Sequence, residues 1–218
     1  IKLYFMIGLP TETYEDLDGI VDLANKVVDL YYSIPKEERT RGLSVTVSAS
    51  TFVPKPFTAF QWYGQNNIEE IKKKQDYLKK NLTNRAVKFN WHEPEISVIE
   101  AILAKGDRRL NDVIYHAWEM GAKFDSWGEF FDYNRWIKAC EDLNIDYKYY
   151  AERNIGLDES LPWDFVNIFV TKGFLKKEYE NAMQEKVTPN CRANCAGCGA
   201  AVAGCGVCFE ERKAKDES

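Results

Sequence analysis

The alternation of strand-like and helix-like segments over residues 1–91 constrains the fold more than any other feature of this sequence. Residues 1–7 are almost entirely apolar, which is typical of a parallel strand that is buried on both faces. Residues 43–53 alternate apolar and polar side chains, and residues 86–91 form a third, shorter strand-like segment. Because a helical pattern separates each of these segments from the next, the order predicts an α/β fold with a parallel sheet.

Helix N-cap patterns mark where the two intervening helices begin. Thr13 is followed three residues later by Asp16, and Asn67 is followed at the same distance by Glu70. Apolar residues then recur at helical spacing after each cap. The sequence therefore predicts one helix after each of the first two strands.

The strand predicted at residues 43–53 carries a row of hydroxyl side chains on one face. The row consists of Ser44, Thr46, Ser48 and Ser50. Such a face is either solvated or lines a polar cavity. Helices cover the outside of most parallel sheets, which argues against solvation, and both interpretations stay open.

The character of the sequence changes at His92. Residues 92–188 contain short helical patterns rich in aromatic residues and interrupted by glycines, so we expect a mostly helical extension. Residues 189–218 contain most of the cysteines. The expected organisation is therefore a parallel α/β part at 1–91, a helical extension at 92–188 and a Cys-rich tail at 189–218.

Five of the six cysteines lie close together in the tail. They are Cys191, Cys195, Cys198, Cys205 and Cys208. The C-x2-C spacing lets two thiolates from one turn reach the same metal, and the Gly and Ala residues between them let the backbone wrap closely. Cysteines at this spacing favour metal ligation in a reducing, cytoplasmic setting over a disulfide scaffold.

The spacing favours an iron–sulfur cluster over zinc. Zinc ribbons separate their two cysteine pairs by roughly 15–20 residues, whereas the gap between the two pairs here is much shorter. A short gap suits one compact cluster, so we expect a 4Fe–4S cluster with one thiol to spare. Structural zinc is the alternative, followed by disulfides or free thiols.

Charge and composition exclude some partners. The net charge is −5, whereas nucleic acids and anionic membranes are bound by basic surfaces. No apolar run is long enough to cross a bilayer. The first residue is Ile1, which lies inside the first predicted strand, so we expect the chain to be a fragment of a longer protein.

Several segments resemble radical S-adenosylmethionine (SAM) enzymes. Residues 3–13 resemble the fifth barrel strand and its following turn, where a hydrophobic strand runs into G-(L/F)-P-x-(E/Q)-T, and residues 43–53 with the Pro-Lys-Pro that follows resemble the sixth strand. Other stretches resemble the uncharacterised subfamily that carries a cobalamin-binding domain. They are Phe-Asn-Trp-His-Glu-Pro at 89–94, Ala-Lys-Gly-Asp-Arg-Arg-Leu at 104–110, Phe-Asp-Ser-Trp-Gly-Glu at 124–129, Leu-Pro-Trp-Asp at 161–164 and Cys-Gly-Val-Cys at 205–208.

This resemblance implies a fold and a cofactor site. Residues 1–91 would be the C-terminal part of a radical SAM partial (β/α) barrel, followed by the helical extension and the Cys-rich tail. In the family, the matching strand and turn lie beside the adenosine of SAM, which implies cofactor-binding roles for Met6, Gly8, Leu9 and Pro10. The family signature G-x-I-x-G-x-x-E is met only in part, because Tyr4 and Thr11 replace its first Gly and its Glu.

The resemblance also implies an activity. The intact enzyme would cleave SAM reductively for radical chemistry on an unknown substrate, using an external electron donor and, through a separate domain, cobalamin. The cobalamin-binding domain, the first half of the barrel and its cysteine triad are expected in the upstream part of the same protein. We therefore expect this fragment to be inactive alone and its tail to hold an auxiliary cluster. The alternative function is a zinc-stabilised structural or interaction module without redox activity.

Three further residues are candidates for substrate or cofactor contact, while the catalytic residues stay unknown. His92 follows a predicted strand, where barrel enzymes place active-site residues; the alternative is a histidine that is bonded to backbone at the strand end. Arg108 and Arg109 follow a Gly-Asp turn and have the geometry to bind a carboxylate bidentately. Their alternative is a solvated helix start capped by Asp107.

Overall fold

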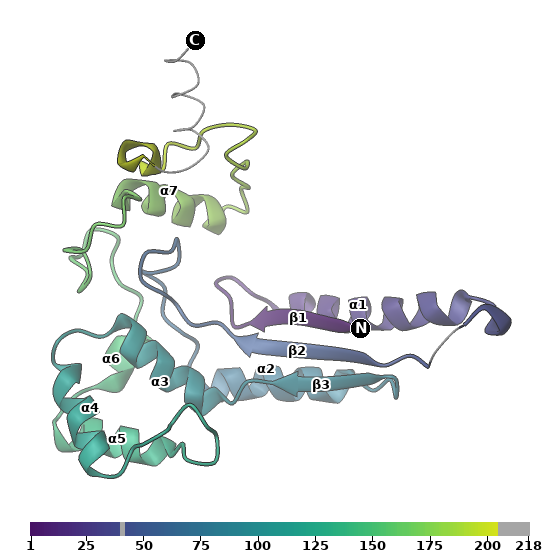
Figure 1. The fold of residues 1–218 in the computed structure, drawn as a ribbon, viewed down its shortest axis with the longest axis horizontal. Coiled ribbons are helices and arrows are strands. Elements are labelled where there is room, and N and C mark those ends of the chain that lie inside the picture. The colour runs from purple at the N-terminus through teal and green to yellow at the C-terminus, as the bar shows by residue number, and fades with distance from the viewer. Residues whose placement is uncertain (40–41, 205–218) are drawn as a thin grey trace. The chain divides into compact units, whose positions relative to one another are not determined.

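Three parallel strands form a single sheet in the order β1–β2–β3 (Figure 1). The computed structural model describes residues 1–39 and 42–204. The strands are β1 (Lys2–Ile7), β2 (Val45–Thr51) and β3 (Val87–Trp91). Val47 of β2 lies opposite Leu3 of β1 and Phe89 of β3. The predicted α/β fold with parallel strands is therefore confirmed, whereas the described residues form no barrel.

Two helices cover one face of this sheet (Figure 1). They are α1 (Tyr14–Ser33) and α2 (Ile68–Asn81). Thr13 and Asp16 form the predicted capping box, and the Asn67 side chain accepts a hydrogen bond from the Glu70 backbone N–H (2.8 Å). Apolar residues of both helices pack on the sheet to form one core, which consists of Ile7, Leu17, Ile20, Ala24, Val47, Ala49 and Leu78.

The opposite face of the sheet is not covered by any described residue. Tyr4 of β1 is 74% exposed and Met6 is 45% exposed, although the apolar run at 1–7 predicts burial on both faces. That prediction is wrong for the described residues, because α1 and α2 pack on the same side. Met6 lies opposite Ser50 of β2, so the predicted hydroxyl row belongs to this uncovered face.

Residues that follow the sheet are helical, as the sequence predicts. The helices are α3 (Pro94–Lys105), α4 (Leu110–Glu119), α5 (Tyr133–Asp142), α6 (Tyr147–Ala151) and α7 (Lys172–Met183), with short 3-10 turns at Lys36–Glu38 and Ala200–Ala203. Helices α3 to α6 share a second apolar core that includes Ile102, Val113 and Cys140. Among the described helices, none combines the length and apolar character that crossing a membrane requires.

The chain divides by its contacts into two compact units. The first contains residues 1–53 and 65–153, and the second contains the loop 54–64 and residues from 154 onward. Trp62 of the loop packs with Leu161, Trp163 and Leu175, which form the core of the second unit. These units group the chain differently from the segments 1–91, 92–188 and 189–218 that were expected from the sequence.

Candidate functional site

The carboxyl ends of all three strands meet at one edge of the sheet. The Phe52 backbone N–H donates to the Ile7 carbonyl oxygen (2.8 Å), and the His92 N–H donates to the Ala49 carbonyl oxygen (3.1 Å). The turn that begins at Gly8, the end of β2 and His92 therefore lie next to one another. This edge is where parallel α/β proteins bind their ligands.

The turn after β1 requires glycine at position 8. Gly8 has a φ of +81°, and a Cβ placed on it would lie 3.3 Å from Asn66 Oδ1. Its N–H donates to both carboxylate oxygens of Glu12 (2.8 and 3.0 Å). Glu12 thereby closes the turn over Leu9 and Pro10, and Pro10 is buried.

A buried ion pair connects this turn to α2. Lys74 Nζ lies 2.8 Å from Glu12 Oε1, and the two side chains are 8% and 5% exposed. Buried charges persist in proteins where they are paired and hydrogen-bonded, and Glu12 satisfies both conditions through Lys74 and Gly8. The pair therefore holds the position of the Gly8 turn relative to α2.

Three buried side-chain oxygens at this edge lack hydrogen-bond partners among the described residues. They are Thr51 Oγ1, Gln65 Oε1 and Asn66 Oδ1. The Gln65 amide is held in place because Nε2 donates to the carbonyl oxygens of Phe52 and Ser97 (both 3.1 Å). Buried polar atoms usually have partners, so these oxygens are suited to accept hydrogen bonds from the N–H groups of a bound molecule.

His92 is held at the start of α3. Its Nδ1 lies 3.1 Å from the hydroxyl of Ser97, and its carbonyl oxygen accepts a hydrogen bond from Gln75 Nε2 (2.8 Å). The Ser97 hydroxyl also donates to the Glu93 carbonyl oxygen (3.4 Å). These contacts fix the ring and the backbone of His92 at the end of β3.

The two arginines lie at the other end of α3, away from His92. This helix has 12 residues, which corresponds to a length of roughly 18 Å. Arg109 makes a bidentate pair with Asp107 (2.6 to 3.1 Å), which raises the pKa of the guanidinium. The fork that could bind a ligand carboxylate is therefore already used by Asp107, and Arg108 is exposed. Neither arginine belongs to the edge of the sheet.

Glu12, Lys74 and Gln65 were not predicted from the sequence. Glu12 lies within the G-(L/F)-P-x-(E/Q)-T pattern, so the motif contained a signal for it. Lys74 lies between Ile71 and Leu78 on the inward face of α2, and a charge in an apolar helical row indicates a buried pair. Gln65 lies in a loop and carries no comparable local signal.

The cysteines of the tail form no disulfide among the described residues. Cys191 and Cys195 are exposed and Cys198 is half-buried. Gly197 and Gly199, between and beyond them, have φ values of 74° and 100°. Cys205 and Cys208 lie outside the described residues. Within the described ranges, no three His, Cys, Asp or Glu side chains are positioned to hold a metal ion. The described thiols alone therefore do not fit a preformed cluster site.

Comparisons with known proteins give a partial similarity. No family model matches the chain, and no solved structure matches it. The chain is similar to an uncharacterised protein of Methanocaldococcus jannaschii, with 34% identity over 115 residues. The aligned region covers 51% of this chain and 22% of that protein. The chain thus matches about a fifth of the length of a relative whose own function is not established.

Proposed function

We propose that this chain is the C-terminal part of a radical SAM iron–sulfur enzyme whose substrate is unknown. In this proposal the sheet belongs to a partial barrel, and the tail binds an auxiliary 4Fe–4S cluster in a reducing, cytoplasmic setting. The observation that carries the proposal is the carboxyl edge of the parallel sheet. There, a glycine turn fixed by a buried ion pair lies beside buried oxygens that have no partners among the described residues.

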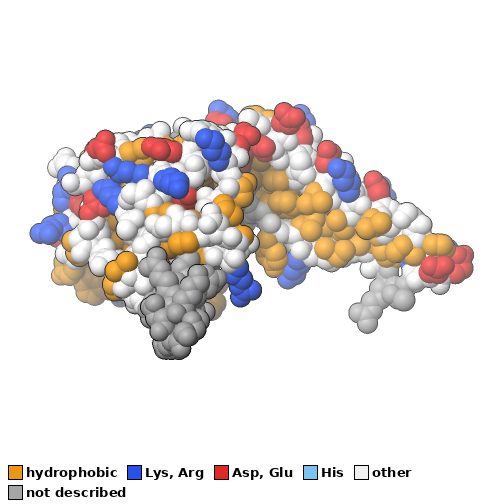
Figure 2. All heavy atoms as spheres, turned by 90° about the horizontal axis from the view of Figure 1, so that it is seen from above, with side chains coloured by type: hydrophobic (Ala, Val, Ile, Leu, Met, Phe, Trp, Pro, Cys, Tyr) orange, Lys and Arg blue, Asp and Glu red, His pale blue; other side chains and the backbone are white. Residues whose placement is uncertain are grey.

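The uncovered side of the sheet supports a larger assembly. Hydrophobic side chains gather along the part of the surface formed by β1 and α1 (Figure 2). Exposed hydrophobic residues of these elements include Tyr4 and Met6 on the uncovered face of β1, and Leu23 and Leu30 on α1. Edge strands and apolar patches of this kind are normally covered, because they otherwise promote aggregation. In the proposed enzyme, the first half of the barrel and a cobalamin-binding domain belong to the upstream part of the same protein.

The edge of the sheet has groups that suit the adenosine of SAM. The unpartnered oxygens of Thr51, Gln65 and Asn66 are acceptors for the amino hydrogens of adenine. Met6 and Gly8 border the same edge from β1. SAM would supply the radical chemistry when bound, and the residues of this chain would bind and orient its nucleoside and exclude water from it.

The tail would bind its metal by folding around it. Thiolate ligands must lose their protons, and metal sites are rarely preformed in the absence of the metal. Cys191, Cys195 and Cys198 form no disulfide, and Cys191 and Cys195 are exposed, so incoming iron can reach them. No chemical step is assigned to this cluster.

Anaerobic reconstitution with ferrous iron and sulfide tests the tail. We expect a brown protein with thiolate-to-iron charge-transfer absorption and about four irons per chain. When the tail cysteines are replaced by alanine one at a time, four of the five single variants should bind less iron. Cys140→Ala is the matched control, because Cys140 lies in the core of α5 and should not affect iron. Tight zinc retention without iron uptake would instead favour the zinc-stabilised structural or interaction module.

Titration with S-adenosylhomocysteine, followed by NMR of the Gly8 amide, tests the edge of the sheet. Asn66→Leu removes one acceptor oxygen at nearly constant volume and should weaken binding about ten-fold, since an unmade buried hydrogen bond costs about 1–3 kcal/mol. Asn111→Leu on the exposed face of α4 is the control and should leave binding unchanged. Equal binding by the two variants would contradict the assignment.

A further inference from the structure

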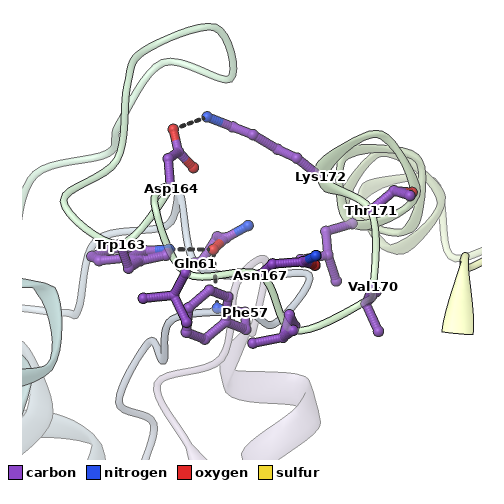
Figure 3. A pocket seen from close by; sticks show the side chains of 11 residues that line it. Phe57, Gln61, Trp163, Asp164, Asn167, Val170, Thr171 and Lys172 are labelled. Atoms are coloured by element: carbon purple, nitrogen blue, oxygen red, sulfur yellow. Dashed lines mark hydrogen bonds and ion pairs between the residues drawn. The ribbon is translucent and has the colours of Figure 1, made fainter. Parts of the chain in front are cut away.

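The second unit contains a cavity that the proposed function does not use (Figure 3). Its volume is about 410 Å³, within the range of small-molecule sites. Phe57 and Gln61 contribute from the loop 54–64, and the segment 163–172 together with Leu175 of α7 completes the wall. All of these residues belong to one compact unit, so the cavity is a feature of that unit alone.

Gln61 has a buried side-chain amide whose oxygen already has its hydrogen-bond partners. The side chain is 1% exposed, and Oε1 accepts hydrogen bonds from Trp163 Nε1 (2.7 Å) and from the Phe57 backbone N–H (3.0 Å; Figure 3). These two bonds use both lone pairs of Oε1 and fix which way the amide faces. Nε2 donates to no other described residue, so it is the group that Gln61 offers to the cavity.

Two further side chains of the wall, Asn167 and Thr171, also keep a free donor. Asn167 Oδ1 accepts from the Phe169 backbone N–H (2.8 Å), which leaves its NH₂ group. Thr171 Oγ1 accepts from the Phe174 N–H (3.2 Å), which leaves its hydroxyl hydrogen. Only the oxygen of Gln61 has both lone pairs used, so the buried amide of Gln61 offers the cavity a donor alone, and the group that it would recognise is a hydrogen-bond acceptor.

The rest of the wall is apolar or electrically balanced. Asp164 and Lys172 form an ion pair at 2.6 Å, and Figure 3 shows this pair apart from Gln61 and Asn167. Apolar side chains complete the surface, with Val166, Ile168, Val170 and Leu175 among them. A ligand for this site therefore combines an acceptor group with an apolar body.

Two aromatic residues next to the cavity have a left-handed backbone. Phe57 has a φ of 62° and Phe169 has a φ of 65°. Bulky residues rarely adopt this conformation, and such strain is concentrated at ligand sites. The Phe57 conformation is held by its hydrogen bond to Gln61, so the same bond fixes both the strained turn and the free donor.

We propose that this cavity binds a small carboxylate with an apolar chain or ring. The carboxylate accepts hydrogen bonds from Gln61 Nε2 and Asn167 Nδ2, and the apolar part packs against Val170 and Leu175. A carboxylate fits because it is an acceptor-only group that can take two or more donors at once.

The proposal is tested with 4-phenylbutyrate and 4-phenylbutylamine, which share an apolar body and differ in the polar group. The indole N–H signal of Trp163 reports binding in the ¹⁵N-labelled chain, because this group bonds to Gln61. It is assigned through Trp163→Phe. We expect a saturable shift with the carboxylate and none with the amine at the same concentrations.

Two variants replace a donor while they keep the internal acceptor. Gln61→Glu retains oxygens for Trp163 and Phe57 but places a second oxygen in the cavity, and we expect at least about ten-fold weaker binding. Asn167→Asp likewise replaces an NH₂ donor by an oxygen, at an exposed position that tolerates substitution, and we expect the carboxylate to bind several-fold more weakly. Asn154→Asp is the matched control. It keeps the oxygen that accepts from Gly64 N–H, lies outside the cavity and should bind normally.

Three outcomes would overturn the proposal. They are the absence of a saturable shift with 4-phenylbutyrate, equal binding of the amine, and normal binding by Asn167→Asp. If Gln61→Glu fails to fold, Asn167→Asp with its control still decides between the outcomes.

Discussion

The buried pair between Glu12 and Lys74 makes a quantitative prediction about stability. Removing one partner of a buried pair leaves an uncompensated charge and costs about 3–5 kcal/mol. Both side chains are less than a tenth exposed, so this range applies here. Glu12→Gln keeps an oxygen for the Gly8 N–H but strands the Lys74 ammonium, and Lys74→Met strands the carboxylate. Each change should therefore lower the free energy of unfolding by about 3 kcal/mol.

The double variant separates the pair from its environment. With both charges removed, no buried ion is left unpaired, so Glu12→Gln combined with Lys74→Met should cost clearly less than the sum of the two single changes. We expect a coupling free energy of about 2 kcal/mol or more. For a domain with a total stability of about 5–15 kcal/mol, single changes of this size are large.

Urea unfolding followed by far-UV circular dichroism measures these free energies. The exposed pair of Glu70 and Lys73 on the same helix is the control, with atoms 3.5 Å apart and side chains 37% and 66% exposed. Glu70→Gln and Lys73→Met should each change stability by less than about 0.5 kcal/mol. If the buried changes cost no more than the exposed ones, or if they are additive, the pair does not hold the turn.

Three further predictions concern single residues. Burial lowers the pKa of Lys105 from 10.5 to about 8. Between these pH values the unfolded chain binds more protons than the folded chain, so the free energy of unfolding should rise with pH by up to about 3 kcal/mol. Lys105→Met should abolish this rise in chemical denaturation curves. Burial raises the pKa of the Cys140 thiol to about 11, so iodoacetamide should modify Cys191 well before Cys140 in the native chain, and mass spectrometry of peptides would reveal the opposite order. Gly8→Ala should lower stability by about 1–2 kcal/mol because of its positive φ, whereas Gly19→Ala, on the open side of α1, should raise it by up to about 1 kcal/mol; equal effects in thermal unfolding would remove the argument for the turn.

The elements that the sequence predicts well are those with local signals. The capping box at Thr13 and the N-cap at Asn67 place the starts of α1 and α2, and alternation over 43–53 places β2. These signals depend on residues within a few positions of one another, so they survive without knowledge of the tertiary structure. The exposure of Tyr4 could not be predicted, because it depends on which face the helices cover.

The parts that could not be predicted depend on contacts between distant residues. Gln61 and Trp163 are 102 residues apart in the chain, and neither carries a local signal of the bond between them. The ion pair of Glu12 and Lys74 joins residues 62 positions apart. Gly8 and His92 lie at the strand ends where the sequence places them, and their role as a site stays a prediction, while the groups that hold them in position were found only in the structure.

The loop 54–64 has a consequence for how the protein is made. It leaves the ribosome about a hundred residues before Trp163, the partner of Gln61. Since synthesis proceeds at about 5–20 residues per second, the remaining core residues are made roughly 5–20 s after Phe57, Phe60 and Trp62. During that time these aromatic side chains are available to chaperones and to other nascent chains. Slow codons between positions 64 and 154 would lengthen this exposure, so expression yield should depend on the translation rate of that stretch.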